Sequence, residues 1–400
     1  MGMKQVDVAI VGGGLAGSLA AAMLGRAGID ALLIDPHASY PADFRCEKLD
    51  GPQAAILRRT GLADIVLPAT TLDGETWVAR FGRLVDKRGG DQYGIRYEAL
   101  VNTVRAAIPQ TAPVLVAKAS AIAPDADRHN VTLSNGETIA ARLVVLATGL
   151  NLGLRRSLGL SREIISACHS VTVGFDIKPL EGRSFPFPSL TYYSDDIAAR
   201  TALLTLFPIG TAMRANLFTY RDMDDPWLHE FRARPTKTLF ALMRGLRALT
   251  GSFEVDGRIM IRPIDLCVTH GHLCGGIVLV GDAFATSCPA AGTGARRALM
   301  DVERLCNVHI PRWLTTPGMA ADKTAAFYND PLKKACDEHS LAKAYELRSF
   351  SLDGGLTWRC RRWAKFAVHY GAGAARRLRR HLTARDKSCS GAFMAPEVAP

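Results

Sequence analysis

The chain has 400 residues, of which 48% are hydrophobic and 22% charged, a composition that excludes a disordered protein and allows a large buried core. The formal net charge of +11 is unevenly spread, because the segment 359–387 holds ten Lys or Arg and one Asp and so carries +9. The nine cysteines include no CxxC pair, which argues against a zinc site or a disulfide framework. We find no export signal and no membrane-spanning run, and therefore expect a cytoplasmic protein without a metal site.

The N-terminal residues predict a strand, a tight turn, a helix and a second strand. Residues 6–11 are a β-branched apolar run typical of a buried strand, residues 18–27 are rich in Ala and Leu, and a second strand ends at Asp35. The turn, Gly12-Gly13-Gly14-Leu15-Ala16-Gly17, fits GxGxxG through Gly12, Gly14 and Gly17. The first two of these glycines let the backbone approach a pyrophosphate, and the third permits close packing of helix on strand. The Asp35 carboxylate is placed to accept hydrogen bonds from a ribose, so the pattern predicts a dinucleotide site.

Later segments predict a continuation of this α/β body and then a second sheet. Apolar residues have helical spacing at 97–108, and short strands are expected at 114–116, 131–133 and 143–146. Longer β-rich runs, typical of an antiparallel sheet, follow at 171–177, 190–193, 201–207 and 212–220. A buried strand at 277–280 and a helix at 295–306 then resume the first fold, so the sheet is an insertion.

A second glycine motif lies far along the chain. The predicted strand at 277–280 ends in Gly281-Asp282, and Pro289, Gly292, Thr293 and Gly294 follow just before a helix. This arrangement predicts a second helix N-terminus able to hold an anion or a carbonyl oxygen. A nicotinamide nucleotide alone does not need two such sites, whereas FAD can use both.

The two glycine motifs together resemble those of the group A flavoprotein monooxygenases, the class of p-hydroxybenzoate hydroxylase, over about residues 5–305. The resemblance implies that Asp282 holds the ribityl hydroxyls of FAD and that the amides of Gly292 to Gly294 face the pyrimidine edge of the flavin. It also places Arg45 beside the flavin and Arg96 in contact with FAD. The reaction it implies is reduction of FAD by NAD(P)H, addition of O2 at the flavin C4a position as a hydroperoxide, and hydroxylation of an aromatic or lipophilic substrate.

One family motif is altered in this sequence. The segment Thr148-Gly149-Leu150-Asn151-Leu152-Gly153-Leu154-Arg155 keeps the glycine and the arginine of the family's middle motif, but Thr148 replaces its acid and Leu152 its serine. That motif is associated with both FAD and NAD(P)H, so the choice between NADH and NADPH stays open.

The resemblance implies an α/β protein with a Rossmann-type, GR2-like FAD-binding domain, an inserted, mostly antiparallel β-sheet domain for substrate, and a helical C-terminal region. We assign 1–70, 96–168 and 258–310 to the FAD-binding domain, 71–95 and 169–257 to the substrate domain, and 311–400 to the basic C-terminal region. On the substrate side, the polar candidates are His169, Tyr192, Tyr193 and Arg214.

Other functions remain open at this level. A reductase of a prenyl or polyene chain uses the same fold. A flavin-dependent halogenase shares the FAD fingerprint, although the Trp-x-Trp-x-Ile-Pro signature of halogenases does not occur in this sequence. The altered middle motif is compatible with a third alternative, a non-catalytic binding protein. In the C-terminal segment 359–387, the aromatic residues Trp363, Phe366 and Tyr370 share one helical face beside basic residues. That pattern suits peripheral contact with the inner face of an anionic membrane, and no nucleic-acid motif occurs; an oligomer is not excluded.

Overall fold

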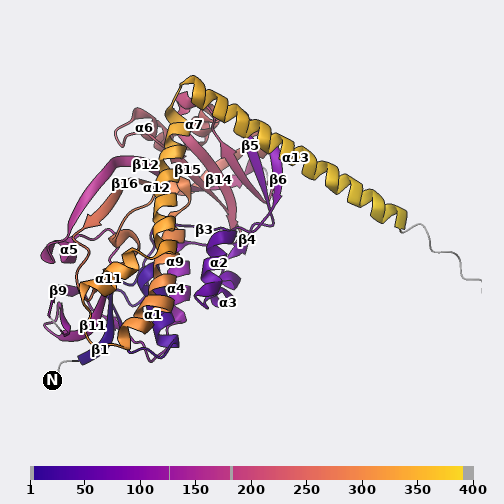
Figure 1. The fold of residues 1–400 in the computed structure, drawn as a ribbon. Coiled ribbons are helices and arrows are strands. Elements are labelled where there is room, and N and C mark those ends of the chain that lie inside the picture. The colour runs from indigo at the N-terminus through magenta and orange to yellow at the C-terminus, as the bar shows by residue number, and fades with distance from the viewer. Residues whose placement is uncertain (1–3, 126, 181–182, 391–400) are drawn as a thin grey trace, which may run out of the picture.

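The computed structural model describes residues 4–125, 127–180 and 183–390 (Figure 1). Its first sheet has seven strands in the order β8-β2-β1-β11-β10-β9, with β17 paired to β11. Its strands are β1 (Lys4–Val11), β2 (Ala31–Asp35), β8 (Val114–Val116), β9 (Ala119–Ala123), β10 (His129–Leu133), β11 (Thr138–Leu146) and β17 (Ile277–Leu279). The pairs β8-β2, β2-β1, β1-β11 and β11-β17 are parallel, as a nucleotide-binding fold requires.

Helices that pack on this sheet position both glycine motifs. They are α1 (Leu15–Arg26), α2 (Gly51–Arg59), α3 (Ala63–Val66), α4 (Tyr97–Ala106), α5 (Gly153–Ser157) and α9 (Gly294–Arg304). Gly17 of α1 lies so close to β1 that a Cβ atom there would sit 1.8 Å from the Gly12 carbonyl oxygen. Only glycine allows this approach, so Gly17 acts through packing, as expected for the third position of the fingerprint.

The second sheet also has seven strands, in the order β16-β12-β15-β14-β13-β5-β6. Its strands are β5 (Glu75–Arg80), β6 (Arg83–Gly89), β12 (Ser161–Pro179), β13 (Ser189–Tyr193), β14 (Thr201–Ile209), β15 (Ala212–Thr219) and β16 (Phe253–His270). All neighbouring pairs are antiparallel except β13 with β5. This confirms the predicted fold class, an α/β nucleotide fold with an inserted, mostly antiparallel sheet.

One face of the second sheet is closed by the short helices α6 (Pro226–Ala233), α7 (Pro235–Leu242) and α8 (Leu246–Thr250). Leu228, Phe231 and Leu246 of these helices are buried against Phe175 and Leu204 of the strands. Each such side chain contributes about 1.5–3 kcal/mol through burial. The opposite face is therefore the one left for a binding site.

The long strands β12 and β16 pass through residues 168/169 and 257/258, where we placed boundaries between the two domains. The two sheets are thus joined by continuous strands, and the division into an FAD-binding and a substrate domain stays a prediction.

A small third sheet, β3-β7-β4, lies between the other two and consists of β3 (Lys48–Leu49), β4 (Thr71–Leu72) and β7 (Tyr93–Gly94). Its register pairs Lys48 with Gly94 and Leu49 with Tyr93. Leu49 is buried in the nucleotide core and Tyr93 packs against it, so this face of the small sheet points away from the second sheet's core.

The C-terminal helices are α10 (Ile310–Leu314), α11 (Ala321–Tyr328), α12 (Pro331–Leu352) and α13 (Leu356–Ser390). Figure 1 shows α12 running along the molecule from the nucleotide fold to the second sheet, and α13 crossing the end of that sheet beside β6. Helix α13 runs through Gly371-Ala372-Gly373 without a break and continues to Ser390. Within the described part of the chain, no helix combines the length and apolarity needed to cross a bilayer.

Candidate functional site

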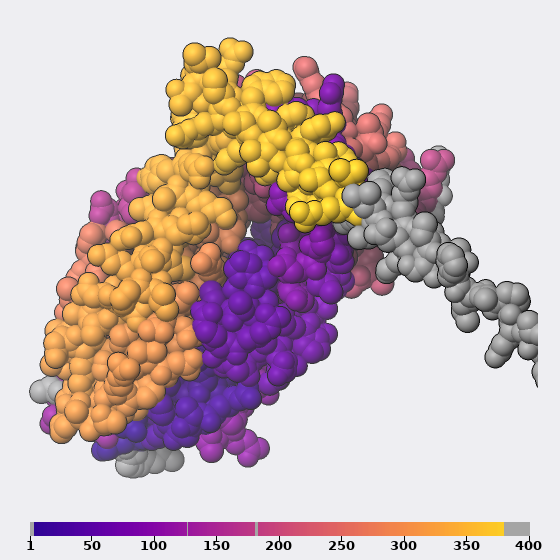
Figure 2. Space-filling view, turned by 45° about the vertical axis from the view of Figure 1, so that its right-hand side comes forward, coloured from indigo at the N-terminus to yellow at the C-terminus, as the bar shows by residue number. Residues whose placement is uncertain are grey.

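A single large cavity of about 1220 Å³ lies between the nucleotide sheet, the free face of the second sheet and the C-terminal helices. It exceeds the roughly 300–1,000 Å³ of ordinary small-ligand sites, so it has room for more than one small molecule. Figure 2 shows the surface hollowed between the orange C-terminal residues and the indigo-to-purple N-terminal residues, beneath α13. The two glycine motifs, 278 residues apart from Gly14 to Gly292, both line this cavity.

The N-terminal motif forms one end of the cavity. Gly12 has φ +101°, and the cavity is lined here by Gly12, Gly14, Leu15 and Ala16, at the N-terminus of α1. Asp35 also lines the cavity, at the end of β2. Its Oδ2 accepts from the Gly13 amide at 2.6 Å, and its Oδ1 lies 3.0 Å from Nη2 of the buried Arg105. Arg105 therefore holds the carboxylate in place, a contact that no local pattern in the sequence indicated.

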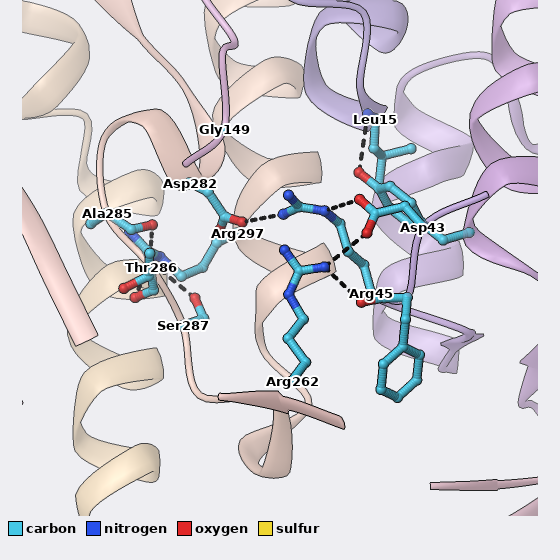
Figure 3. Close-up of polar contacts among 12 residues, drawn as sticks. Leu15, Asp43, Arg45, Gly149, Arg262, Asp282, Ala285, Thr286, Ser287 and Arg297 are labelled. Atoms are coloured by element: carbon cyan, nitrogen blue, oxygen red, sulfur yellow. Dashed lines mark hydrogen bonds and ion pairs between the residues drawn. The ribbon is translucent and has the colours of Figure 1, made fainter. Parts of the chain in front are cut away.

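The central part of the site is an ion-pair chain. Arg45 donates to Asp282 at 2.9 Å and to Asp43 at 2.5 Å, and Arg262 of β16 donates to Asp43 at 2.8 Å. Figure 3 shows the Arg45 side chain lying between Asp282 and Asp43, with Arg262 reaching the same Asp43. Burial by itself raises the pKa of Asp43, but the two guanidinium groups outweigh it and hold this pKa below its ordinary value. Two residues predicted from separate motifs, Arg45 and Asp282, are thereby brought into direct contact.

The second glycine motif forms the opposite wall. Gly281, Asp282, Pro289, Gly292 and Gly294 line the cavity, and Gly292 has a left-handed φ of +67°. The side chain of Gln53 donates to the Gly292 carbonyl oxygen at 3.0 Å and also completes a capping box with Asp50 at the start of α2. Thr293 does not line the cavity, because its hydroxyl bonds Ser340 of α12 at 2.7 Å.

The altered middle motif lies between the other two. Thr148, Gly149 and Asn151 line the cavity, and the Thr148 hydroxyl is buried without a hydrogen-bond partner among the described residues. Buried Arg155 donates to the carbonyl oxygens of Asn151 at 2.9 Å and of Ala283 at 2.7 Å. The arginine that matches the family motif therefore connects this segment to the Gly281-Asp282 turn and does not line the cavity.

The free face of the second sheet contributes alternate residues, as the pleat dictates. Four of its strands line the cavity through the following residues: Thr191 and Tyr193 of β13, Leu203, Thr205 and Phe207 of β14, Asn216 and Phe218 of β15, and Arg262 and Ile264 of β16. Of the four substrate-side candidates from the sequence, Tyr193 alone is in this set.

The other three substrate-side candidates do not line the cavity. Tyr192 alternates with Tyr193 and is buried on the opposite face, where its hydroxyl bonds the Arg244 carbonyl oxygen. His169 is fully buried against Tyr220 and Tyr345, and burial lowers its pKa. Arg214 is buried in an ion pair with Glu47 at 2.7 Å. Strand parity and buried pairing remove these side chains from the cavity.

Arg96, the predicted FAD contact, also lies outside the cavity lining. Its guanidinium pairs with Asp176 at 2.7 Å and with Glu47 at 3.4 Å. Burial by itself lowers the pKa of Arg96, yet these carboxylates raise it above its ordinary value. The geometry assigns Arg96 to a structural ion network under the cavity, and Glu47, which does line the cavity, is a residue that the motif analysis did not single out.

The C-terminal helices form a wall that the sequence did not predict. This wall consists of Lys343, Glu346, Leu347 and Phe350 of α12 and of Lys365 and His369 of α13. Arg80 of β5 donates to His369 Nδ1 at 3.3 Å and to Asp195 at 2.6 Å. Burial and the neighbouring arginines lower the pKa of His369 to about 4, so its ring is neutral and can accept this hydrogen bond.

The site fits FAD. A glycine cradle at a helix N-terminus suits a pyrophosphate, Asp35 and Asp282 offer carboxylates at the ends of β2 and β17 for sugar and ribityl hydroxyls, and the Gly292–Gly294 loop offers backbone amides at the far wall. The unpartnered Thr148 hydroxyl adds a polar group between them. Fold and site together define a flavoprotein in which one cavity lies between the two large sheets.

The chain belongs to the family described as FAD binding domain, which it matches over residues 5–308. This confirms the predicted cofactor, FAD, and the resemblance to the group A flavoprotein monooxygenases. Among solved structures, p-nitrophenol 4-monooxygenase PnpA from Pseudomonas putida DLL-E4 superposes with a TM-score of 0.72 at 19% identity, covering 96% of this chain and 98% of that one.

Curated relatives match over a shorter region. The ubiquinone hydroxylase UbiL of Rhodospirillum rubrum is 30% identical over 172 residues, which cover 39% of this chain and 40% of the relative. The menaquinone reductase of Mycobacterium tuberculosis is 34% identical over 168 residues, again 39% and 40%. The chain thus spans about two fifths of the length of the curated relatives it matches.

Proposed function

We propose that this protein is an FAD-dependent monooxygenase that uses NAD(P)H and O2 to hydroxylate an aromatic or lipophilic small molecule. The observation that carries the proposal is the single cavity in which both glycine motifs meet the free face of the second sheet. The family match and the hydroxylase names among the relatives support it. Bound FAD would supply the redox and oxygen-transfer chemistry.

The chain's own residues bind, orient and exclude water. The amides at the start of α1 and the carboxylates of Asp35 and Asp282 would hold the nucleotide. The Arg45–Asp282 pair would align the middle of the cofactor with the sheet. Apolar residues such as Leu203, Phe207 and Phe218 would hold the substrate, and α12 and α13 form one wall that limits its contact with bulk water.

The test begins with the purified protein and its flavin spectrum. Retained or reconstituted FAD, followed by oxygen uptake coupled to NAD(P)H oxidation and increased by phenolic or quinone-like compounds, is the expected result. A protein that takes up no FAD would instead be the non-catalytic binding protein.

A prenyl-chain reductase is the second candidate, and the similarity to a menaquinone reductase favours it. It would also take up FAD, but it would form a saturated product in the absence of oxygen. Product analysis under anaerobic conditions separates the two activities.

We also propose that α13 lies on an anionic membrane surface. The residues of α13 that face the rest of the protein recur at steps of three and four and are Arg362, Phe366, His369, Gly373 and Arg376. Phe366, which contacts Phe81, therefore lies on this side and not with Trp363 and Tyr370, with which the sequence analysis grouped it. About a quarter turn away, Leu356, Trp363, Tyr370 and Leu378 form a second stripe, each at least half exposed. We call these four residues the apolar stripe. Exposed Arg359 and Arg377 flank it, a combination typical of interfacial helices. The structure does not describe the side chains of residues 380–387, which belong to the same basic segment.

Sedimentation with phosphatidylcholine vesicles, with and without phosphatidylglycerol, tests the membrane proposal. Combining Leu356→Ser, Tyr370→Ser and Leu378→Ser should weaken binding to the anionic vesicles by roughly ten-fold or more, because apolar burial is lost. The matched control is Val368→Ser, which removes an equally exposed apolar side chain from another side of α13. Equal binding of the wild-type chain and the triple variant would contradict the proposal.

A further inference from the structure

The part of the cavity beneath α13, which we call its outer end, has a buried arginine at its centre (Figure 2). Arg80 of β5 lines the cavity, is 3% exposed and donates to Asp195 at 2.6 Å. Its guanidinium carbon lies 4.1 Å from the centroid of the Tyr193 ring and 5.5 Å from that of the Phe350 ring. Phe81 and Asp195 beside it have left-handed backbones, with φ +48° and +55°, a costly conformation that clusters at active sites and ligand-binding sites.

His369 and Tyr193 each offer a hydrogen-bond donor at the outer end. A guanidinium group can only donate, so the bond from Arg80 requires His369 Nδ1 to accept, and the proton of the neutral ring is then on Nε2. This N–H has no hydrogen-bond partner among the described residues, and neither has the Tyr193 hydroxyl. The two rings have centroids 6.4 Å apart, and both side chains line the cavity. A ligand with two acceptor oxygens can therefore contact both donors.

The outer end also has a positive charge that no carboxylate offsets. The charge of Arg80 is offset by Asp195. The charge of Lys365 on α13 is offset by Glu346 on α12, 3.1 Å away. Lys343, one turn before Glu346, lines the cavity and makes no hydrogen bond or ion pair with any described residue. Because one of the cavity-lining cations has no counter-ion, the outer end favours a singly charged anion.

A hydrophobic track connects the outer end with the second glycine motif. Five residues of one hydrophobic cluster form this track in the cavity wall: Tyr193, Leu203, Phe218, Leu347 and Ala290. Ala290 belongs to the short turn Pro289–Ala291, directly before Gly292 and the expected flavin position. A ligand that follows the track is therefore elongated, with a polar group at the outer end and an apolar body that extends toward the flavin.

We propose that the outer end is a subsite for the carboxylate of an amphiphilic monocarboxylic acid, such as a fatty acid, whose hydrocarbon part lies along the hydrophobic track. The carboxylate oxygens accept from His369 Nε2 and from the Tyr193 hydroxyl, and Lys343 supplies the opposite charge. The inference rests on the proposed function only for the far end of the ligand, which it places beside the flavin. Binding involves no covalent or redox step.

The chemistry of the outer end favours a carboxylate over other polar groups. Its two oxygens match the two neutral donors, and its single charge matches the one lysine without a counter-ion. A phosphate monoester would bring a second negative charge close to Glu346, and an amide or alcohol would leave the charge of Lys343 without a counter-ion. Lys343 and His369 lie beyond residue 308, where the family match ends, so this subsite depends on the C-terminal helices.

The experiment measures the binding of octanoate, decanoate and the matched neutral ligand octanamide to the FAD-loaded protein by calorimetry, without vesicles. We expect octanoate to bind at least ten-fold more tightly than octanamide, because hydrogen bonds to a charged acceptor are stronger than those to a neutral one. Decanoate should bind roughly ten-fold more tightly than octanoate, because two further methylene groups are buried on the hydrophobic track.

Three conservative variants test the named groups. Tyr193→Phe removes the hydroxyl and keeps the ring. His369→Asn keeps an acceptor for Arg80 but has no donor at the position of Nε2, and Lys343→Met removes the charge. Each should lower the preference for octanoate over octanamide at least three-fold, and the combined variant should abolish it. Lys178→Met, which removes an exposed lysine outside the cavity, is the control for Lys343→Met and should keep the wild-type preference.

Two results would overturn the inference. One is equal affinity of the wild-type holoenzyme for octanoate and octanamide, and the other is a combined variant that keeps the wild-type preference. FAD content and NAD(P)H-dependent oxygen uptake are measured on the same samples, so a protein without flavin or without oxygen uptake contradicts the proposed function and not the subsite. Where the subsite is upheld, oxygen uptake stimulated by decanoate identifies the acid as a substrate, whereas binding without stimulation identifies a fatty acid held as a ligand.

Discussion

At the scale of single residues, Lys48, which lines the cavity, lowers the stability of the folded protein. Lys48 has an ordinary pKa of 10.5 in the unfolded chain and about 8 in the folded protein, because burial disfavours its charged form. The folded protein therefore binds fewer protons than the unfolded chain between about pH 8 and 10.5. The free energy of unfolding therefore rises with pH across this window. Below about pH 8, the destabilisation caused by the buried charge of Lys48 is fully present.

We expect Lys48→Met to raise the free energy of unfolding at pH 7 by on the order of 1–2 kcal/mol, and by less at pH 9.5. The physical reason is that Met fills similar space without a buried charge. Urea unfolding of the FAD-saturated protein at both pH values measures the difference. A loss of stability at pH 7 would mean that the amine has a structural partner.

At the scale of elements, one glycine and two polar contacts help to hold α13 against the second sheet. A Cβ atom on Gly373 would lie 2.1 Å from the Val85 carbonyl oxygen of β6. On either side, His369 accepts from Arg80 and Arg376 pairs with Asp86 of β6. Helix α13, which we propose to contact a membrane, is thus also bound to strands β5 and β6 beside the cavity.

The substitution Gly373→Ala should separate α13 from β6, because the new methyl group collides with backbone. Gly371→Ala is the matched control, since nothing lies within 4 Å of the added atom and alanine stabilises a helix by about 1 kcal/mol relative to glycine. Hydrogen exchange of residues 356–379 should become faster in Gly373→Ala and slower or unchanged in the control. Equal exchange in the two variants would show that the contact with β6 does not hold the helix.

At the scale of the whole molecule, the cofactor site exists only where distant segments meet. Gly14 follows β1, whereas Gly292 follows β17 and the long inserted sheet. A ligand that bridges them stabilises the folded state by mass action, by about 2.7 kcal/mol when its free concentration is 100 times its Kd.

We expect FAD to raise the Tm of the wild-type protein but not that of Gly14→Val. A Cβ atom at Gly14 would meet only Tyr97 and Tyr40 atoms, at 3.7 Å and 3.9 Å, so we expect the fold to tolerate a substitution there. The methyl groups of valine would occupy the space of the nucleotide. Thermal unfolding with and without FAD tests this, with Gly89→Val as the control in open space on β6. An FAD-dependent shift in Gly14→Val equal to that of wild type would place the nucleotide elsewhere.

The amino-acid sequence by itself determined the two glycine turns, most strands and the cofactor, because these depend on residues close together in the chain. Gly12, Gly14 and Gly17 specify a turn through their own backbone freedom, and apolar alternation specifies a strand within five to ten residues. The match of Arg45 and Asp282 to family motifs likewise required no knowledge of their contact.

Only the tertiary structure decided which side chains face the substrate part of the cavity. A shift of one residue along a strand moves a side chain to the other face, so Tyr192 and Tyr193 could not be told apart before the register of β13 was known. Arg96, Arg214 and His169 are held by partners far along the chain, and the pairing of Lys48 with Gly94 sets the side of the small sheet on which the lysine lies. Such long-range packing has no local pattern, which is the physical reason why the sequence predicted the cofactor and the glycine turns but not the cavity wall formed by the second sheet and the C-terminal helices.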